Sequence, residues 1–249
     1  MLRFSDVTKT FPGGQTALAS VSLDVPRGQF CVVLGSSGAG KSTLLRTING
    51  MIVPTSGSVE VDGVRMTPKT LRRIQAETAT VHQQFNLVGR LSVLTNVLAG
   101  TLSKVSTPRA ILRLFPEAYR RKACALLAEV GLEEEHLYRR ASRLSGGQQQ
   151  RVAIARAFIL DPKVVLADEP VASLDQTGSR TIMRLLRRTS AQRGSTVLCS
   201  LHQVDLAREF ADRIVAMRAG AVVYDGLPSG LDAVTLDRIY AANTGPAFA

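Results

Sequence analysis

A glycine-rich segment, GSSGAGKST, follows a run of apolar residues in the first fifth of the chain. It fits the spacing G-x-x-x-x-G-K-S, whose glycines let the backbone wrap closely around phosphate oxygens. In this pattern the lysine reaches the terminal phosphates of a nucleoside triphosphate, and the serine hydroxyl binds Mg²⁺. The loop alone does not separate a small-molecule kinase, a GTPase and a transport ATPase. We expect the nucleotide to bind at Gly35, Ser36, Ser37, Gly38, Ala39, Gly40, Lys41, Ser42 and Thr43.

Two carboxylates follow a second apolar run, VVLAD, at residues 164–168. Ligands bind at the carboxyl ends of strands in open α/β sheets, which is where Asp168 and Glu169 would lie. Asp168 suits the outer coordination of Mg²⁺, and Glu169 suits the polarisation of a water for attack on the γ-phosphate. Two acids at a solvated strand end are common, so this interpretation depends on the phosphate loop.

A histidine and a glutamine are further candidates at the same sheet edge. His202 follows the apolar run of residues 196–200, and a place beside the phosphate site favours contact with the γ-phosphate, although a lone histidine is more often structural. Gln83 lies where the sheet gives way to a helical segment. Its amide can touch Mg²⁺ or water and respond to movement of that segment, but Gln84 is an equal candidate on spacing alone.

The segment RLSGGQQQRVAIARA, residues 143–157, predicts a helix with a second anion site at its start. Ser145 and Gln148 have the spacing of a capping box. Gly146 and Gly147 each cost the helix about 1 kcal/mol relative to alanine, but they leave backbone N–H groups open to an anion. Since the chain already has a phosphate loop, a second copy packed head to tail could bring its Ser145–Gln148 over the first copy's γ-phosphate. Two ATP molecules would then lie at a two-fold interface.

The elements that position these residues predict an α/β fold, a P-loop NTPase core of RecA-like type. Alternating residues at 18–28 and 56–64 predict antiparallel strands, whereas helices between the runs at 164–168, 196–200 and 213–217 predict a parallel sheet with right-handed crossovers. Helical periodicity from about residue 85 predicts an inserted helical subdomain, with Gly131 as a helix stop. We expect one domain over 1–249, with the core at about 1–84 and 159–226, the helical subdomain at about 85–158 and a short tail at 227–249.

Composition narrows the functional classes. The chain has 249 residues, a net charge of +11 and three widely separated cysteines, Cys31, Cys124 and Cys199, which favours a reduced cytosolic compartment. No apolar run approaches the ~18 residues of a membrane span, and the start lacks a secretory signal. The basic clusters are scattered and have no interleaved aromatic residues, so a solvated surface or membrane proximity is favoured over nucleic acid.

In this order, the motifs closely resemble those of the ATP-binding cassette ATPases, over about residues 2–240. The resemblance implies that Gly35–Thr43 is the Walker A loop and that Asp168 and Glu169 are the Walker B pair. It further implies these roles: Gln83 as the Q-loop glutamine, Leu144–Gln148 as the signature, Ser173–Asp175 as the D-loop, His202 as the switch histidine and Phe11 as the ring that stacks on adenine.

Narrower features resemble the ATPase subunits of phosphonate importers. They are the segments Gln83–Gly100, Leu166–Gln176 and Ser200–Ala207 and the longer insert Ser106–Ala123. His82 departs from the phenylalanine usual in the family. The resemblance implies ATP and Mg²⁺ as cofactors and a homodimer peripheral to the cytoplasmic face of the inner membrane. It also implies two transmembrane permease subunits, an extracytoplasmic phosphonate-binding protein and no nucleic acid.

Alternatives remain at this point. Importers of phosphite or phosphate share much of the pattern, and a cassette that drives a membrane partner mechanically without moving cargo carries the same motifs. A nucleic-acid cassette would have a long coiled-coil insertion or two cassettes, and this chain has neither. Leu87 and Val88, beside Arg90, are candidates for a groove that receives permease helices, with burial in the helical insert as the alternative.

Overall fold

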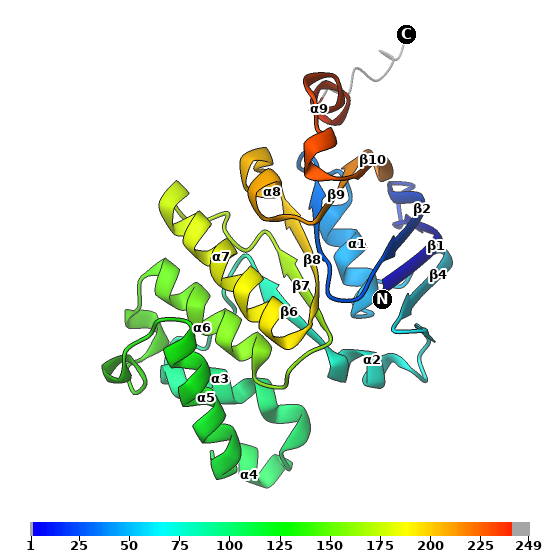
Figure 1. The fold of residues 1–249 in the computed structure, drawn as a ribbon. Coiled ribbons are helices and arrows are strands. Elements are labelled where there is room, and N and C mark those ends of the chain that lie inside the picture. Colours follow the sequence, from blue (N-terminus) through cyan, green and yellow to red (C-terminus); the bar gives the residue numbers. More distant parts are fainter. Residues whose placement is uncertain (1, 241–249) are drawn as a thin grey trace.

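The computed structural model describes residues 2–240, which form two sheets and a helical lobe (Figure 1). The strands are β1 (Leu2–Thr10), β2 (Thr16–Val25), β3 (Phe30–Leu34), β4 (Ser56–Val61), β5 (Val64–Arg65), β6 (Thr78–His82), β7 (Val164–Asp168), β8 (Thr196–Leu201), β9 (Arg213–Arg218) and β10 (Ala221–Gly226). The α-helices are α1 (Lys41–Ile48), α2 (Leu71–Glu77), α3 (Val93–Leu98), α4 (Thr107–Ile111), α5 (Glu117–Glu129), α6 (Gly146–Phe158), α7 (Gln176–Arg193), α8 (Val204–Phe210) and α9 (Ala233–Tyr240). Of the predicted tail, residues 241–249 lie outside the described residues.

The larger sheet has the strand order β10-β9-β3-β8-β7-β6. Its five strands from β9 to β6 are parallel, and β10 pairs antiparallel with β9. The predicted parallel sheet with helical crossovers is therefore confirmed. Because the parallel strands all end at one edge, the loops that follow β3, β6, β7 and β8 meet there.

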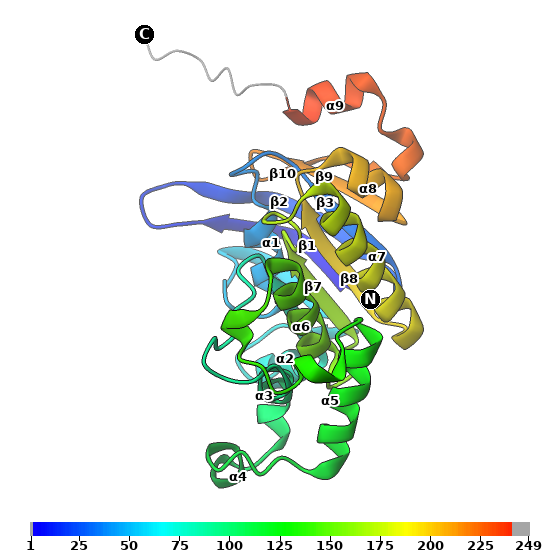
Figure 2. The ribbon, with the colours of Figure 1, turned by 90° about the vertical axis from the view of Figure 1, so that its left-hand side faces the viewer.

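The smaller sheet is antiparallel, with the order β2-β1-β4-β5. Alternate residues of β3 face opposite sides, so Cys31 and Val33 pack in the core under the small sheet and α1, while Val32 faces the core under the helices. Cys31 and Cys199 are buried, as the apolar runs around them predict. Figure 2 shows the larger sheet between these two layers, the small sheet with α1 on one side and the helices on the other.

The helical lobe consists mainly of α3, α4, α5 and α6. Gly131 follows α5 with a φ of 75°, and its N–H donates to the carbonyl of Ala128 at 2.9 Å, so the predicted helix stop is confirmed. The apolar side chains of α3, α5 and α6 belong to the same buried cluster as one face of the larger sheet. The lobe therefore shares its interior with the core, and the division at about residues 84 and 158 stays a prediction.

Among residues 2–240, no helix combines the length and the apolar character needed to cross a membrane.

Candidate functional site

The phosphate loop occupies the turn between β3 and α1. Gly35 and Gly40 have φ angles of 155° and 102°, which favour glycine. A Cβ on Gly35 would lie 2.4 Å from the carbonyl oxygen of Met217, and one on Gly40 would lie 2.4 Å from that of Ala17. The fold itself therefore requires glycine at both ends of the loop.

Lys41 is buried at the first position of α1. Its Nζ donates to the carbonyl oxygens of Gly35 at 2.8 Å and Ser36 at 3.0 Å and lies 3.7 Å from Oε1 of Glu169. Burial lowers the pKa of Lys41, and the charges of Glu169 and Asp168 oppose that shift. An ammonium group with so little water around it gains strongly from a phosphate oxygen.

Asp168 ends β7 among hydroxyl groups. Its Oδ1 accepts hydrogen bonds from Ser42 and Ser200, both at 2.8 Å, and its Oδ2 lies 3.6 Å from Arg46. A hydroxyl and a carboxylate in direct contact are the hard oxygen ligands that Mg²⁺ prefers. The donor set therefore fits the predicted metal.

Glu169 follows with a φ of 47°, an uncommon backbone conformation for this residue type. Its N–H donates to the hydroxyl of Ser200 at 2.9 Å, which holds this backbone in place. One carboxylate oxygen lies 3.8 Å from Nδ1 of His202, whose side chain is half exposed. The structure thus brings together Lys41, Asp168, Glu169 and His202, as expected from their strand ends.

The register of β6 against β7 places Gln83 at the same sheet edge as Asp168 and Glu169. Its neighbour His82 pairs with Asp168 across β6 and β7, so Gln83 is the first residue beyond that pair. Burial lowers the pKa of His82, and the positive charge of Arg156 adds to the shift. Gln83 and Gln84 are both exposed, so their side chains are open to a ligand.

A pocket of about 240 Å³ extends from the phosphate loop to the turn between β1 and β2. Phe11 lines it from that turn, which closes with a hydrogen bond from the N–H of Phe11 to the carbonyl of Gln15 at 2.9 Å. Glu169 lines it from the other side. An aromatic ring and a phosphate loop in one pocket suit a purine nucleotide, whose base can stack while its phosphates bind the loop.

The signature helix begins with the predicted capping box. Ser145 Oγ accepts from the N–H of Gln148 at 3.3 Å, and Gln148 Oε1 accepts from the N–H of Ser145 at 3.0 Å. A Cβ at Gly147 would meet nothing within 4 Å, and one at Gly146 would make only ordinary contacts. Packing within the chain therefore does not require these glycines, in contrast to Gly35 and Gly40.

Ser145–Gln148 does not line the nucleotide pocket of its own chain in the part of the molecule that the structure describes. The end of the helix is partly exposed, and α6 packs in the helical lobe. A helix N-terminus with open glycines and no ligand from its own chain is suited to a second copy.

Sequence reasoning missed three residues that support the site. Ser200 bridges Asp168 and Glu169, and its signal was a hydroxyl at the carboxyl end of a buried strand. Arg156 donates to the carbonyl oxygens of Phe85 at 2.9 Å and Asn86 at 2.6 Å, and thus ties α6 to the segment after Gln83. Burial lowers the pKa of this arginine.

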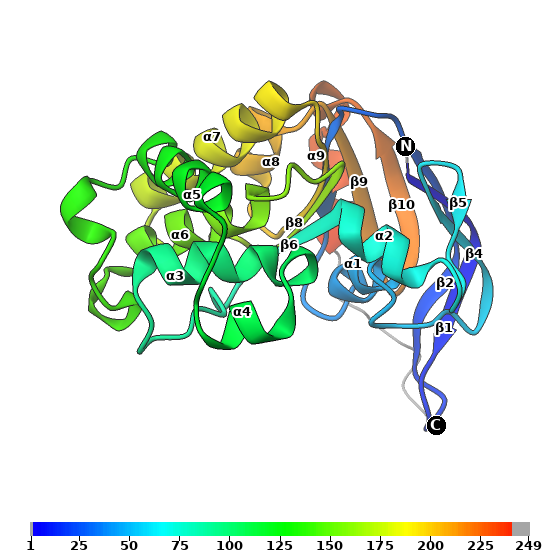
Figure 3. The same cartoon turned by 90° about the horizontal axis from the view of Figure 1, so that it is seen from below.

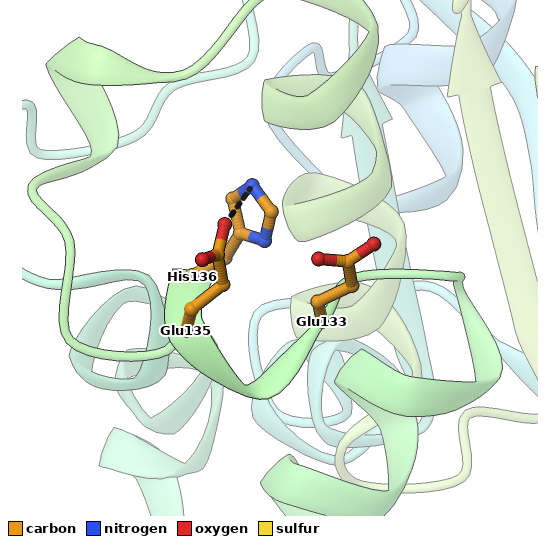
Figure 4. A group of neighbouring side chains, drawn as sticks. All are labelled: Glu133, Glu135 and His136. Atoms are coloured by element: carbon orange, nitrogen blue, oxygen red, sulfur yellow. Dashed lines mark ion pairs between the residues drawn. The ribbon is translucent and has the colours of Figure 1, made fainter.

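The third is His136, which lies beside the signature. Its side chain gathers with those of Glu133 and Glu135 in the turn before the signature (Figure 4), and their candidate ligand atoms lie within 4.8 Å of one another. Glu135 also pairs with Arg139 at 2.9 Å, and His136 Nε2 lies 3.2 Å from the amide nitrogen of Gln148. Because Glu135 and His136 already have partners, we interpret the cluster as a support for Gln148.

The parallel sheet, the phosphate loop and the carboxylates at its edge define a P-loop nucleoside triphosphatase with an inserted helical lobe. The profile of the ABC transporter family matches residues 18–172. Two similar proteins carry the name phosphonates import ATP-binding protein PhnC. The one from Hydrogenovibrio crunogenus is 52% identical over 240 residues, which cover 96% of this chain and 88% of that protein. The one from Thiobacillus denitrificans is 52% identical over 239 residues, which cover 96% and 92%. The chain belongs to the ABC transporter family and is one of its ATP-binding, ATP-hydrolysing subunits.

Solved structures confirm the predicted fold. The dimeric, post-hydrolysis structure of the ATP-binding cassette MJ0796 with ADP and Pi has a TM-score of 0.78 and 34% identity and covers 92% of this chain and 99% of that one. The structure of cbiO1 from Clostridium perfringens has a TM-score of 0.81 and 29% identity, with coverage of 92% and 88%.

Proposed function

We propose that this chain is the energy-coupling ATPase subunit of an importer for organophosphonates. The names of two relatives, each 52% identical to this chain over the aligned residues, describe phosphonate import, and these names support the assignment of the cargo. The residues described above bind a nucleotide and leave no role for the cargo, so selectivity belongs to other subunits. A phosphite or phosphate importer is the alternative within the family, and a mechanical signalling cassette is the alternative outside transport.

The proposed nucleotide site uses the whole phosphate loop. Lys41 and the loop N–H groups bind the phosphates, and Phe11 stacks on the base. Ser42, Gln83 and Asp168 would hold Mg²⁺, which neutralises charge between the phosphates when bound. Glu169 orients and polarises the attacking water, and His202 contacts the γ-phosphate. The contact of Lys41 with Glu169 at 3.7 Å keeps this carboxylate beside the loop.

The observation that carries the proposed mechanism is the contrast among the glycines. Gly35 and Gly40 are required by neighbouring backbone atoms, whereas Gly147 faces open space. We propose that Ser145, Gly146, Gly147 and Gln148 bind the γ-phosphate held by a second copy. ATP would then be hydrolysed only in a head-to-tail homodimer, and hydrolysis would loosen that dimer.

The proposed partners are two transmembrane permease subunits and an extracytoplasmic phosphonate-binding protein, with this chain peripheral to the cytoplasmic face of the inner membrane. A groove of about 490 Å³ between α2, η1 (Ala99–Lys104) and the end of α6 is suited to a permease helix. Arg156 lines this groove and donates to the carbonyl of Phe85, two residues after Gln83. A helix seated there would therefore displace the Gln83 segment.

Of the two apolar residues that the sequence suggests for contact with a permease, Val88 is exposed, whereas Leu87 packs against the main core. Only Val88 therefore remains a candidate for contact with a permease. We further propose that about residues 85–158 form the helical subdomain and that this subdomain receives the permease.

The test is ATP-driven uptake of radiolabelled 2-aminoethylphosphonate in cells that depend on this chain. We expect uptake with the unaltered chain and none with Glu169→Gln, which should still bind ATP and accumulate as a dimer. Excess phosphite and excess phosphate are the matched competitors. If phosphite or phosphate competes more strongly than unlabelled phosphonate does, the competing compound is the cargo. If the complex transports none of the three compounds, a signalling role is favoured.

A further inference from the structure

The far end of the helical lobe carries an exposed segment, residues 102–114, which we call the tip. It comprises the end of η1, the connection after it, and α4 with the turn that follows (Figure 1). No residue of α4 is buried. Neither the nucleotide site nor the proposed permease groove accounts for most of this segment.

Apolar side chains project from the tip into solvent. Ile111, Leu112 and Leu114 are 74%, 66% and 60% exposed, and Leu102 at the start of the tip is exposed as well. Backbone hydrogen bonds give the turn a defined shape: Leu112 donates to the carbonyl of Pro108 at 3.1 Å, and Leu114 donates to that of Arg109 at 2.8 Å. Exposed apolar side chains that lie close together in sequence on an ordered turn indicate an interaction surface.

The charge of the tip is entirely positive. Lys104, Arg109 and Arg113 are exposed, and none of them forms an ion pair within residues 2–240. The sequence has no acidic residue between Glu77 and Glu117. Glu117 itself lies 3.6 Å from Arg121, so its charge is offset. A basic and apolar surface of this kind is complementary to anionic phospholipid, in which apolar side chains enter the acyl boundary and cations meet phosphates.

The tip adjoins the groove that we assign to the permease. Lys104 lines this groove and is also the first basic residue of the tip. Figure 3, seen from below, shows α2, α3 and α4 together in the foreground. A chain seated on a permease through this groove would therefore present the tip toward the same membrane. This step rests on the proposed function.

We propose that the tip binds the anionic phospholipid surface next to the permease. Ile111, Leu112 and Leu114 enter the headgroup region, and Lys104, Arg109 and Arg113 contact lipid phosphates. The tip then gives the subunit a second attachment to the membrane, independent of the nucleotide site.

The test is flotation of the purified full-length chain with vesicles of phosphatidylethanolamine and phosphatidylglycerol, compared with vesicles of phosphatidylcholine alone. We expect binding to the anionic vesicles that weakens with salt. The variant R109Q/R113Q should bind about thirtyfold more weakly, because each cation near an anionic membrane contributes about 1 kcal/mol to the binding free energy. The variant I111S/L112S/L114S should lose binding at low and high salt. The matched control L227S/V234S alters two exposed apolar residues on the C-terminal part of the described chain and should bind normally.

Each variant should keep the basal ATPase rate and the ATP affinity of the unaltered chain, which shows that it has folded. Equal flotation with both vesicle types, or normal flotation of both tip variants, would overturn the proposal. Loss of permease co-purification in detergent, with flotation unchanged, would assign the tip to a protein partner and also overturn it. Failure of phosphonate uptake with normal flotation would instead reject the cargo and leave the lipid contact standing.

Discussion

The side-chain amide nitrogen of Gln148 lies 3.2 Å from Nε2 of His136, which is 9% exposed. Since Gln148 Oε1 already accepts from the N–H of Ser145, the amide nitrogen must donate and Nε2 must accept. The proton of the neutral ring therefore lies on Nδ1, which has no hydrogen-bond partner in the described part of the chain. His136 thus sets the orientation of a signature side chain from outside the motif.

Removal of this acceptor should weaken the signature without touching the phosphate loop. We expect His136→Leu to lower kcat about fivefold, the effect of one lost hydrogen bond, and to leave ATP binding to the monomer unchanged. His136→Asn, which can still accept, should recover part of the rate. Steady-state ATPase assays with nucleotide titration of the monomer provide the measurement, and a loss confined to monomer affinity would contradict the assignment.

Mixing of two inactive variants tests whether the sites are shared between chains. Ser145→Arg blocks the signature, and Lys41→Ala disables the phosphate loop, so each alone should show almost no turnover. A mixed dimer contains one site with an intact loop and an intact signature only if the two come from different chains. We therefore expect ATPase activity to reappear on mixing. Activity that stays absent, although mixed dimers form, would place the signature at its own chain's nucleotide.

Ser200→Ala should affect both stability and chemistry. The change removes a donor to Asp168 and leaves the N–H of Glu169 without its partner, at a cost of about 1–3 kcal/mol in the free energy of unfolding. We also expect kcat to fall about tenfold, because the backbone of Glu169 is no longer held. Urea unfolding and ATPase assays measure the two effects.

Ser195→Ala is the matched control for that experiment. Ser195 is equally buried, but it donates to the carbonyl of Pro162 at 2.6 Å, away from the nucleotide pocket. It should lose similar stability and keep a normal kcat. If both variants lose the same fraction of kcat, then Ser200 has only a structural role.

Acid should weaken the attachment of the helical lobe at Glu129. Two hydrogen bonds of 3.0 and 2.7 Å join its carboxylate to Arg193 of α7, and they lower the pKa of Glu129 from its ordinary value of 4.5. The folded pKa is below the unfolded one, so the pair stabilises the fold above about pH 4.5 and is lost as the pH falls through the folded value.

Glu129→Gln should therefore reduce the loss of stability as the pH falls below about 5, measured by urea unfolding at each pH. Glu117→Gln is the control, because the pair of Glu117 with Arg121 is exposed and contributes little. An unchanged pH profile for Glu129→Gln would show that other carboxylates govern acid unfolding.

The sequence predicted the phosphate loop, the parallel sheet and the signature helix because local pattern determines each of them. Gly35 and Gly40 stand where neighbouring backbone atoms leave no room for a side chain, and Asp168 and Glu169 stand at the end of the buried strand β7. The supporting contacts were not predictable in the same way. Arg156 reaches carbonyl oxygens 70 residues away, and His136 acts across a turn, so both look like ordinary polar residues in sequence.

The shared interior of the sheet and the helical lobe limits how this ATPase can transmit force. Phe158 of α6 is fully buried among apolar side chains of both parts, and the guanidinium of Arg193 on α7 lies 5.6 Å from its ring centre. A wide hinge opening would expose this interior to water. The lobe should instead slide by small steps over the sheet, so the proposed permease partner would receive a small displacement from a rigid lobe.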